Sequence, residues 1–517
     1  MLHPLKLPPG LQLYTALAAV SIPVAYALGI KYSQWRVRRR ARRAGAIIPR
    51  RWEGKRIGSL DLLQYGMERF QNGYIEREFG HVQELYIMWD SIYLTTDPGI
   101  TKYSAGPEFR DTMHSVLGTG VFNADGMFHR TMTRPYFSRD RISHFELFNR
   151  HGDLAIKKMK DRFAAGRALD FQDLVARFTL DSATEFLFGS CVNSLHADLP
   201  YPYNDPDAKL YAREASNVEA FATAFLGAQN VISIRMRVGW MWRFKELFYD
   251  AGAEHMRVVD AFIQPILEAA IKKNKEAGNA GEESKDNDNE TLLDHLVKFT
   301  DDSQHLIAGR DTTATTLSFA VYLLCLYPAI GPTAMPTFDD IRGMKYLRAV
   351  INETLRLYPA PFNVRVANRD TTVPNPDPTQ PPFFVSKGTS LAYSVFLMHR
   401  RRTYGAPMVS LEFDPDRFLD ERVNKHFTNN PFIFCRSTPG LGSFAYNEMS
   451  FFLIRLLQNF SHMEMDLAAQ PPEARPSPEW ASAEGQKGRE KVVAKSHLTM
   501  YIHGGLWVRM TEAERET

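Results

Sequence analysis

Cysteine is scarce in this sequence, which has only three among 517 residues: Cys191, Cys325 and Cys435. Three thiols cannot build a disulfide framework, so most of the chain is expected in a reducing compartment. Cys191 and Cys325 occur in apolar helical patterns, and we interpret both as core residues. Cys435 needs an explanation of its own.

The sequence also lacks an excess of charge of either sign. Its 62 Lys and Arg residues nearly balance 59 Asp and Glu residues, which leaves a formal net charge of +3. A dedicated nucleic-acid binder usually carries a strong basic excess, so the balance argues against nucleic acid as a partner. The 30 prolines and 32 glycines follow no repeat, which excludes collagen and low-complexity disorder. A hydrophobic content of 44% is enough for a large core.

Only one apolar run is long enough to cross a bilayer. The stretch from Leu11 to Ile30 is uncharged and would span roughly 30 Å as a helix. The basic residues that follow it are Lys31, Arg36, Arg38, Arg39, Arg40, Arg42 and Arg43. By the positive-inside rule we predict a single-pass anchor in residues 1–30 and a basic linker in residues 31–50, with the remainder cytosolic.

Two alternatives exist for this N-terminal region. Ala25-Tyr26-Ala27 is similar to a signal-peptide cleavage site, but the apolar run is long for a signal and the basic cluster is typical of a stop-transfer sequence. The arginines are more simply explained by anionic lipid headgroups than by nucleic acid.

Residues 51–517 are predicted to form one large domain, mainly α with a minor β portion. Apolar residues recur at three- and four-residue spacing in several stretches, while strand-like patterns are short. The expected helices are Phe145–Phe163, Asp170–Phe188, Ala251–Ile271 and Phe444–Phe460. The expected strands are Phe383–Val385, Thr389–Tyr393, and His497–Ile502 paired as a hairpin with Leu506–Val508. The polar segment Asn274–Glu290 is expected to be a loop.

Polar residues interrupt an apolar helical stretch at Ala308-Gly309-Arg-Asp311-Thr312-Thr313. Gly309 in a helix costs about 1 kcal/mol relative to Ala but lets a ligand approach the backbone. An acid beside a hydroxyl is a proton-delivery pair, because Thr312 can hold a water or peroxide while Asp311 exchanges protons with solvent. The alternative is a helix start, with Asp311 or Thr312 as the cap.

A second motif is Glu353-x-x-Arg356, whose charges share one face of an amphipathic helix that ends at Pro359. This spacing alone is common by chance. It gains weight because Phe413-Asp-Pro-Asp-Arg417-Phe418 follows and supplies a second arginine flanked by aromatic residues.

Together these motifs resemble the cytochrome P-450 superfamily of haem-thiolate monooxygenases, and within it the membrane-bound fungal type. The resemblance runs from about Asp125 to Met510 and also includes Pro361-Phe-Asn-Val-Arg365, His399-Arg400 and Phe444-Ala-Tyr-Asn-Glu448. It implies the cytochrome P-450 fold, haem b with its iron, and electrons from NADPH through a reductase. It also implies an endoplasmic reticulum location, with membrane lipid and an apolar small molecule as further partners.

The resemblance assigns roles to individual residues. Glu353 and Arg356 would pair with Arg417 to brace the haem pocket, and Arg130 and Arg365 would contact the haem propionates. Asp311 and Thr312 would deliver protons. The bulky residues between Phe221 and Tyr249 would form a cover over an apolar pocket, although ordinary helix packing explains them as well.

The sequence departs from the family at the haem ligand. The family segment Phe-x-x-Gly-x-Arg-x-Cys-x-Gly corresponds here to Phe434-Cys-Arg-Ser-Thr-Pro-Gly-Leu-Gly442, which has Gly440 or Leu441 where the cysteine belongs. Cys435 is the candidate axial ligand, because a thiolate there would push electron density to the iron. The alternative is a small buried thiol.

Other segments of the chain are shorter than in the family or have different residues. Gly126 occupies the position of a family tryptophan, and the chain is short before Ala308 and after Leu326. We interpret these losses as a faulty join in the coding sequence. The predicted function is therefore a haem monooxygenase, an oxidoreductase that hydroxylates a fatty acid, alkane or aromatic compound with molecular oxygen. The alternatives are a haem-free pseudoenzyme or defective product of the same fold, and an unrelated helical interaction protein.

Overall fold

The computed structural model describes residues 9–62, 64–65, 82–88, 90–95, 107–117, 145–211, 217–279, 291, 308–328, 344–359, 363–375, 377, 379–400, 411–422, 441–483 and 486–513. The chain divides into two compact units. The first comprises Met1–Leu62, Phe79–Ser104 and Val364–Tyr393, and the second comprises Leu63–Glu78, Ala105–Asn363 and Ser394–Thr517.

The first unit is built on a five-stranded sheet with the order β1-β2-β3-β8-β5. Its strands are β1 (Arg51–Trp52), β2 (Val82–Ile87), β3 (Asp90–Thr95), β5 (Asn363–Val366) and β8 (Ser390–Tyr393). The β2–β3 pair is antiparallel, while β1 and β8 run parallel to their neighbours β2 and β3. A separate antiparallel pair joins β6 (Thr371–Val373) to β7 (Phe383–Val385).

Helix α1 (Pro9–Arg43) belongs to the first unit and packs through its C-terminal end. Ala41 and Ala46 form a buried cluster with Phe384 of β7. Earlier in the helix, Tyr14, Leu17, Val24, Tyr26 and Leu28 are exposed. Among the described residues no helix combines the length and apolarity needed to cross a membrane, so the predicted spanning helix is not supported.

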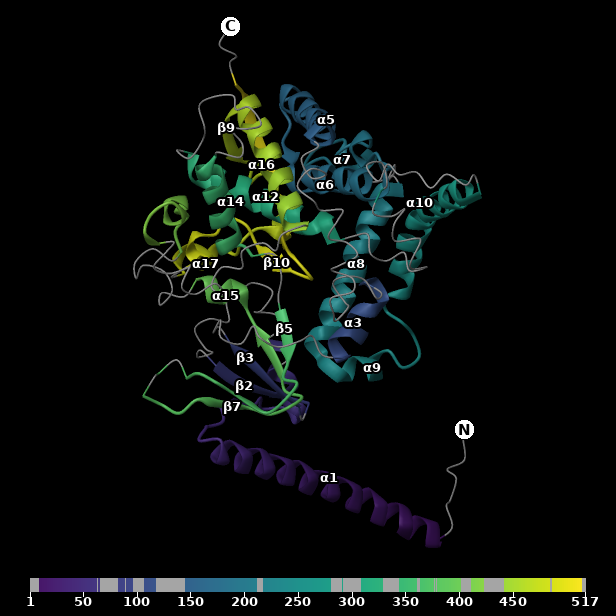
Figure 1. The fold of residues 1–517 in the computed structure, drawn as a ribbon, viewed down its shortest axis with the longest axis vertical. Coiled ribbons are helices and arrows are strands. Elements are labelled where there is room, and N and C mark those ends of the chain that lie inside the picture. Colours follow the sequence, from purple (N-terminus) through teal and green to yellow (C-terminus); the bar gives the residue numbers. More distant parts are fainter. Residues whose placement is uncertain are drawn as a thin grey trace. The chain divides into compact units, whose positions relative to one another are not determined.

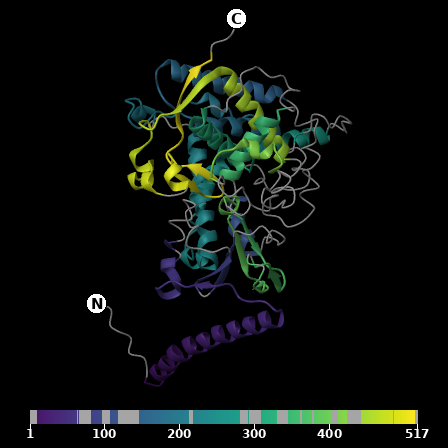
Figure 2. The ribbon, with the colours of Figure 1, turned by 90° about the vertical axis from the view of Figure 1, so that its left-hand side faces the viewer.

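The second unit is mostly helical (Figures 1 and 2). Its longer helices are α3 (Pro107–Leu117), α5 (Phe145–Ala164), α6 (Phe171–Phe188), α8 (Asn217–Val238), α10 (Ala253–Asn279), α12 (Ala308–Leu326), α14 (Lys345–Leu357) and α16 (Leu441–Asn459). Short helices are α7 (Ala208–Tyr211), α9 (Trp242–Lys245), α15 (Val395–His399) and α17 (Gln486–Arg489). The 3-10 turns used below are Ser194–His196 and Pro415–Phe418.

Helix α12 lies at the centre of the core, in contact with α6, α14 and α16. Leu317, Phe319, Val321 and Tyr322 are all buried on it. A helix that is apolar on every side is stable only when other elements surround it, which explains why the sequence shows little amphipathic pattern here. The Phe319 ring stacks on Tyr358, with centroids 4.1 Å apart, and so joins α12 to the end of α14.

The strands of the second unit correct one prediction. The expected hairpin between His497–Ile502 and Leu506–Val508 does not form. Instead β11 (Met500–Ile502) pairs with β10 (Ala494–Ser496), and β12 (Trp507–Glu512) pairs with β4 (Leu169–Asp170) and β9 (Phe460–Met465). Gly504 and Gly505 have positive φ and separate the two sheets.

Candidate active site

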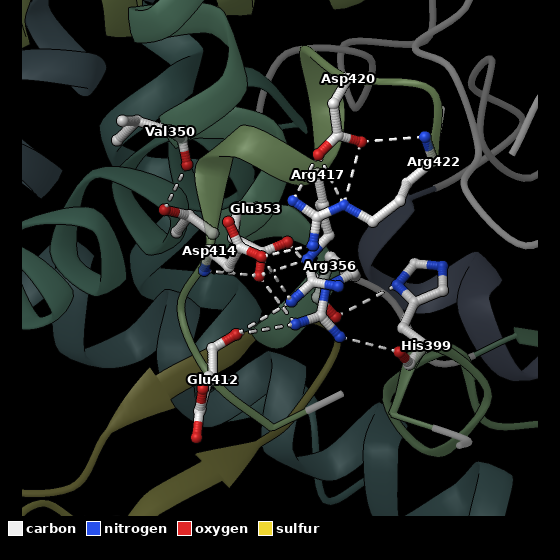
Figure 3. A network of polar contacts seen from close by, with 10 residues as sticks. Val350, Glu353, Arg356, His399, Glu412, Asp414, Arg417, Asp420 and Arg422 are labelled. Carbon is white, nitrogen blue, oxygen red and sulfur yellow. Dashed lines mark hydrogen bonds and ion pairs between the residues drawn. The ribbon is translucent and has the colours of Figure 1, made fainter. Parts of the chain in front are cut away.

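A buried carboxylate holds two buried guanidinium groups in the second unit (Figure 3). On α14, Arg356 Nε and Nη2 donate to the two oxygens of Glu353 at 2.7 and 2.8 Å. The three-residue spacing places both side chains on one face of the helix. Both side chains are buried, with Glu353 0% and Arg356 3% exposed to solvent.

The second guanidinium comes from the 3-10 turn Pro415–Phe418. Arg417 Nε donates to Glu353 Oε1 at 3.0 Å, and the backbone amide of Asp414 donates to the same oxygen at 3.0 Å. Burial lowers the pKa of Arg417, whereas the Glu353 charge opposes that shift. Glu353 therefore fixes the loop at Asp414 to α14 by both charge and a backbone hydrogen bond.

A third element joins the network through backbone groups. Arg356 Nη1 donates to the carbonyl of His399 at 2.9 Å, and His399 Nδ1 lies 3.2 Å from the carbonyl of Arg356. Burial, helped by the charges of Arg356 and Arg400, lowers the pKa of His399 to about 3. A neutral ring whose Nδ1–H donates to the carbonyl fits this site, so α14 and α15 are joined reciprocally.

The acid and alcohol of the first motif lie in the first turns of α12. The structure places Asp311 and Thr312 inside the helix, so neither is its N-cap and that alternative is wrong. The amide nitrogen of Gln229, on α8, donates to Asp311 Oδ2. The carbonyl of Thr312 accepts a hydrogen bond from the Thr316 hydroxyl at 2.9 Å. Gly309 is helical, one turn before Thr313.

Glu448 is a buried polar residue to which the sequence analysis gave no role. It lies on α16 and is 0% exposed, and its carboxylate oxygens form no hydrogen bond with the described residues. Burial raises the pKa of Glu448 well above the usual value. The nearby Ser182 hydroxyl lowers this pKa in part, although it forms no hydrogen bond with the carboxylate. An acid flanked by apolar positions on a helix predicted to be buried is the only sequence signal that could have found it.

Several predicted site residues fall outside this description. Arg130, Cys435 and the segment around Gly440 lie outside the described residues. Arg365 is placed in β5 by its backbone alone. The structure therefore brings together Glu353, Arg356 and Arg417, and it places Asp311 and Thr312 on the central helix.

Two of the three cysteines lie in the part of the chain that the structure describes. Cys325 packs against the core at the end of α12, and burial raises the pKa of its thiol to about 12. Cys191 lies in the loop after α6, and burial raises its pKa to about 11. Cys435, the remaining cysteine, lies outside the described residues.

A buried ionic lock beside a central helix that carries an acid–alcohol pair, in a mostly helical protein, is the arrangement of a haem-dependent oxygenase. The family profile named Cytochrome P450 matches residues 59–482. The chain is 33% identical to cytochrome P450 52A3-A of Candida maltosa, over 74% of this chain and 77% of the relative. It is 32% identical to the cytochrome P450 monooxygenase pvhE of Talaromyces variabilis, over 74% and 76%. The chain belongs to the cytochrome P450 family.

The fold comparison agrees. A crystal structure of the cytochrome P450DA heme domain superposes with a TM-score of 0.64 and 18% identity, covering 90% of this chain and 99% of that one. The chain therefore has the cytochrome P450 fold, mostly helical with minor sheets, and is by family a monooxygenase. The family uses haem b and takes electrons from NADPH through a reductase.

The alignment with the Candida maltosa relative also bears on chain length. It runs over 434 positions but covers only 74% of these 517 residues. The relative therefore carries residues that this chain lacks within the aligned stretch.

Proposed function

We propose that this chain is a haem monooxygenase that inserts one atom of molecular oxygen into a C–H bond of an apolar substrate, such as a fatty acid, an alkane or an aromatic compound. The single observation that supports it most is the Glu353–Arg356–Arg417 network, because a buried ionic triad is costly to keep where it has no role. Family membership supports the same conclusion.

Haem would supply the oxygen binding and the oxidation, and the protein would supply binding, orientation and protons. Cys435 would be the axial ligand, and Arg130 and Arg365 would neutralise the propionates. Gly309 would leave room for the substrate or cofactor to approach the α12 backbone. The Glu353 network would hold the loop at Asp414 in place behind the pocket.

Asp311 and Thr312 would handle protons. The amide of Gln229 donates to Asp311 Oδ2 and so orients the carboxylate. A carboxylate held in this way would exchange protons with water, and the Thr312 hydroxyl would hold a water beside it and donate a hydrogen bond. Asp311 and Thr312 would each return to the starting protonation state at the end of a catalytic cycle.

The absorption spectrum of the reduced, carbon-monoxide-bound protein tests the proposal. We expect a thiolate-type Soret band in the wild type and in Cys325→Ala, the matched control for a cysteine outside the site. The band should be lost in Cys435→Ala. Absence of haem from the wild type would overturn the enzymatic proposal for this chain and leave the family assignment intact.

The second candidate is a haem-free pseudoenzyme or a defective product of the same fold. The residues missing relative to the Candida maltosa protein support it, as does the absence of a cysteine at the aligned position. Sequencing the transcript distinguishes a faulty join from a real loss: a transcript that encodes the missing residues supports the faulty join, and one that lacks them overturns it.

We also propose that the chain works at the endoplasmic reticulum membrane, with NADPH–cytochrome reductase as its electron donor. The exposed apolar side chains in the first half of α1 and the arginines at its end support contact with lipid. Fractionation of cells tests this: the protein should sediment with microsomes and resist high salt. Recovery in the soluble fraction would overturn it.

A further inference from the structure

Three potential metal ligands from separate places in the sequence lie close together in the second unit, and none of them is a residue assigned to the haem site. His151 on α5, Asp181 on α6 and Cys191 in the following loop each offer one ligand atom, and these atoms lie within 4.8 Å of one another. His151 and Asp181 are buried, and Cys191 is half-buried. This is the one such group found in the part of the chain that the structure describes.

The loop that carries Cys191 is held in a defined conformation. Gly189 ends α6 in the left-handed region with φ +66°, which turns the chain back along the helix. The amide of Val192 then donates to the Thr184 hydroxyl at 3.4 Å. The Cys191 sulfur itself accepts a hydrogen bond from the amide of Asn193 at 3.3 Å.

Asp181 holds the next part of the same loop. Its two oxygens accept hydrogen bonds from the amides of Ser194 and Leu195 at 2.7 and 2.9 Å. An ionised carboxylate has about four acceptor sites, so two remain for a cation. These amide bonds orient the carboxylate in the way that outer-shell groups orient the ligands of a metal.

His151 is oriented by a neighbouring acid. Its Nε2 lies 2.7 Å from Glu185 Oε2, and Arg150 pairs with the other oxygen of Glu185 at 2.7 Å. A ring that donates Nε2–H to Glu185 keeps the lone pair on Nδ1, which is then available to a metal. A carboxylate behind a ligating histidine is the usual outer-shell arrangement at zinc.

Charge and ligand type select the ion. One thiolate, one carboxylate and one neutral imidazole balance a divalent cation, so a half-buried site would carry no net charge. Thiolate with imidazole favours zinc over the harder calcium and magnesium ions. We propose that His151, Asp181 and Cys191 bind one zinc ion that ties α5 to the loop after α6, with water as the fourth ligand.

The geometry requires a modest closure. Tetrahedral zinc with bonds of about 2.0–2.3 Å keeps its ligand atoms about 3.4–3.8 Å apart, against the upper limit of 4.8 Å here. The three ligand atoms would therefore move closer together when the ion binds. The thiol, whose pKa of about 11 is set by burial and by Asp181, would lose its proton when zinc binds, so uptake would increase with pH.

Zinc content and thiol protection test the proposal on the full chain. After incubation with zinc chloride and dialysis, we expect one zinc per chain in the wild type and in Cys325→Ser, the matched cysteine control. Cys191→Ser and His151→Gln should retain none while keeping a wild-type circular dichroism spectrum. Zinc should also slow alkylation of Cys191 at least tenfold in peptide mapping, with no effect on Cys325.

Two results would overturn the site. One is less than one tenth of a zinc per wild-type chain after dialysis. The other is zinc retained by a folded Cys191→Ser variant, which would assign the metal to other ligands. Neither readout depends on haem or on turnover, so the result is independent of the proposed monooxygenase activity.

Discussion

The Glu353 carboxylate is the residue on which two buried cations depend. Glu353→Gln removes the charge while Arg356 and Arg417 stay buried, which typically costs about 3–5 kcal/mol. We expect that loss in the free energy of unfolding, measured with urea. Glu464→Gln, at an exposed glutamate on β9, is the control and should change stability by less than about 1 kcal/mol. Equal losses in the two variants would contradict a structural lock.

His399 makes stability depend on pH. Its folded pKa of about 3 lies below the ordinary value of 6.5. The neutral ring therefore stabilises the fold fully above about pH 6.5, and this contribution is lost as the pH falls toward 3, by at most about 1.4 kcal/mol per pH unit.

A variant that cannot titrate isolates this effect. Asn at position 399 can still donate to the Arg356 carbonyl, so we expect His399→Asn to lose less stability than the wild type between pH 6.5 and 5. Urea unfolding at several pH values measures the difference. Parallel curves for the two proteins would show that His399 is not held neutral.

Asp311 is predicted to matter for protons and not for folding. Asp311→Asn keeps an oxygen for the Gln229 amide, so the unfolding midpoint should stay near that of the wild type. Substrate hydroxylation should fall about 10²-fold, with a larger solvent deuterium isotope effect. The rate of product formation and the NADPH consumed, both measured in H2O and in D2O, check this. An unchanged rate and isotope effect would remove Asp311 from the proton path.

The sequence predicts the pairing and burial of some site residues and not of others. The pairing of Glu353 with Arg356 follows from helix periodicity, whereas the place of Arg417 came from the family resemblance, because nothing local links positions 64 residues apart. The burial of Glu448 could not be predicted. Acidic residues are almost never buried without a partner, so sequence reasoning assigns such a residue to the surface.

Among the elements, α6 shows how one side chain connects a helix to a distant strand. Asp170 caps α6 by accepting from the amides of Gln172 and Asp173 at 3.0 and 3.4 Å, and it also accepts from Leu506 before β12 at 2.9 Å. Burial raises the pKa of Asp170 to about 7. Asp170→Ala should cost about 1–2 kcal/mol for the cap, with a further loss for the Leu506 amide.

Asp170→Asn is the matched control. It keeps an oxygen for the amides and avoids burying a charge, so at pH 8 it should be at least as stable as the wild type. Thermal unfolding of the three proteins at pH 8 gives the order. If Asp170→Asn lowers the unfolding temperature as much as Asp170→Ala, one side-chain oxygen at this position is not enough to cap α6.

Local pattern explains which elements were predicted. The boundaries of α5, α6 and α16 agree with the sequence within a few residues, because their apolar stripes and the cap at Asp170 are local signals. The hairpin at Gly504 was wrong because strand partners are chosen by contacts that are distant in sequence: β12 joins β9 and β4. The loop predicted for Asn274–Glu290 is wrong over its first six residues, since α10 continues to Asn279, and its remainder lies outside the described residues.

At the scale of the whole molecule, α1 combines two different environments. Its exposed apolar residues run from Tyr14 to Trp35, whereas its packing against Phe384 of β7 is made near its end. Arg40 pairs with Asp370 at 2.8 Å, and Ile47 bridges to Phe383 just after the helix. Removal of the two parts should therefore have different consequences.

Deletion of residues 1–30 should leave the unfolding temperature unchanged and release the protein from microsomes, because it removes exposed apolar side chains and keeps the cluster of Ala41 and Ala46 with Phe384. Deletion of residues 1–50 should also lower the unfolding temperature by several degrees, since it removes Ala41 and Ala46 from the cluster around Phe384 and the backbone bridge at Ile47. Calorimetry and microsome sedimentation of both variants measure these effects. Equal unfolding temperatures for the two deletions would show that the end of α1 does not stabilise the sheet unit, and continued sedimentation without residues 1–30 would place the membrane contact elsewhere in the chain.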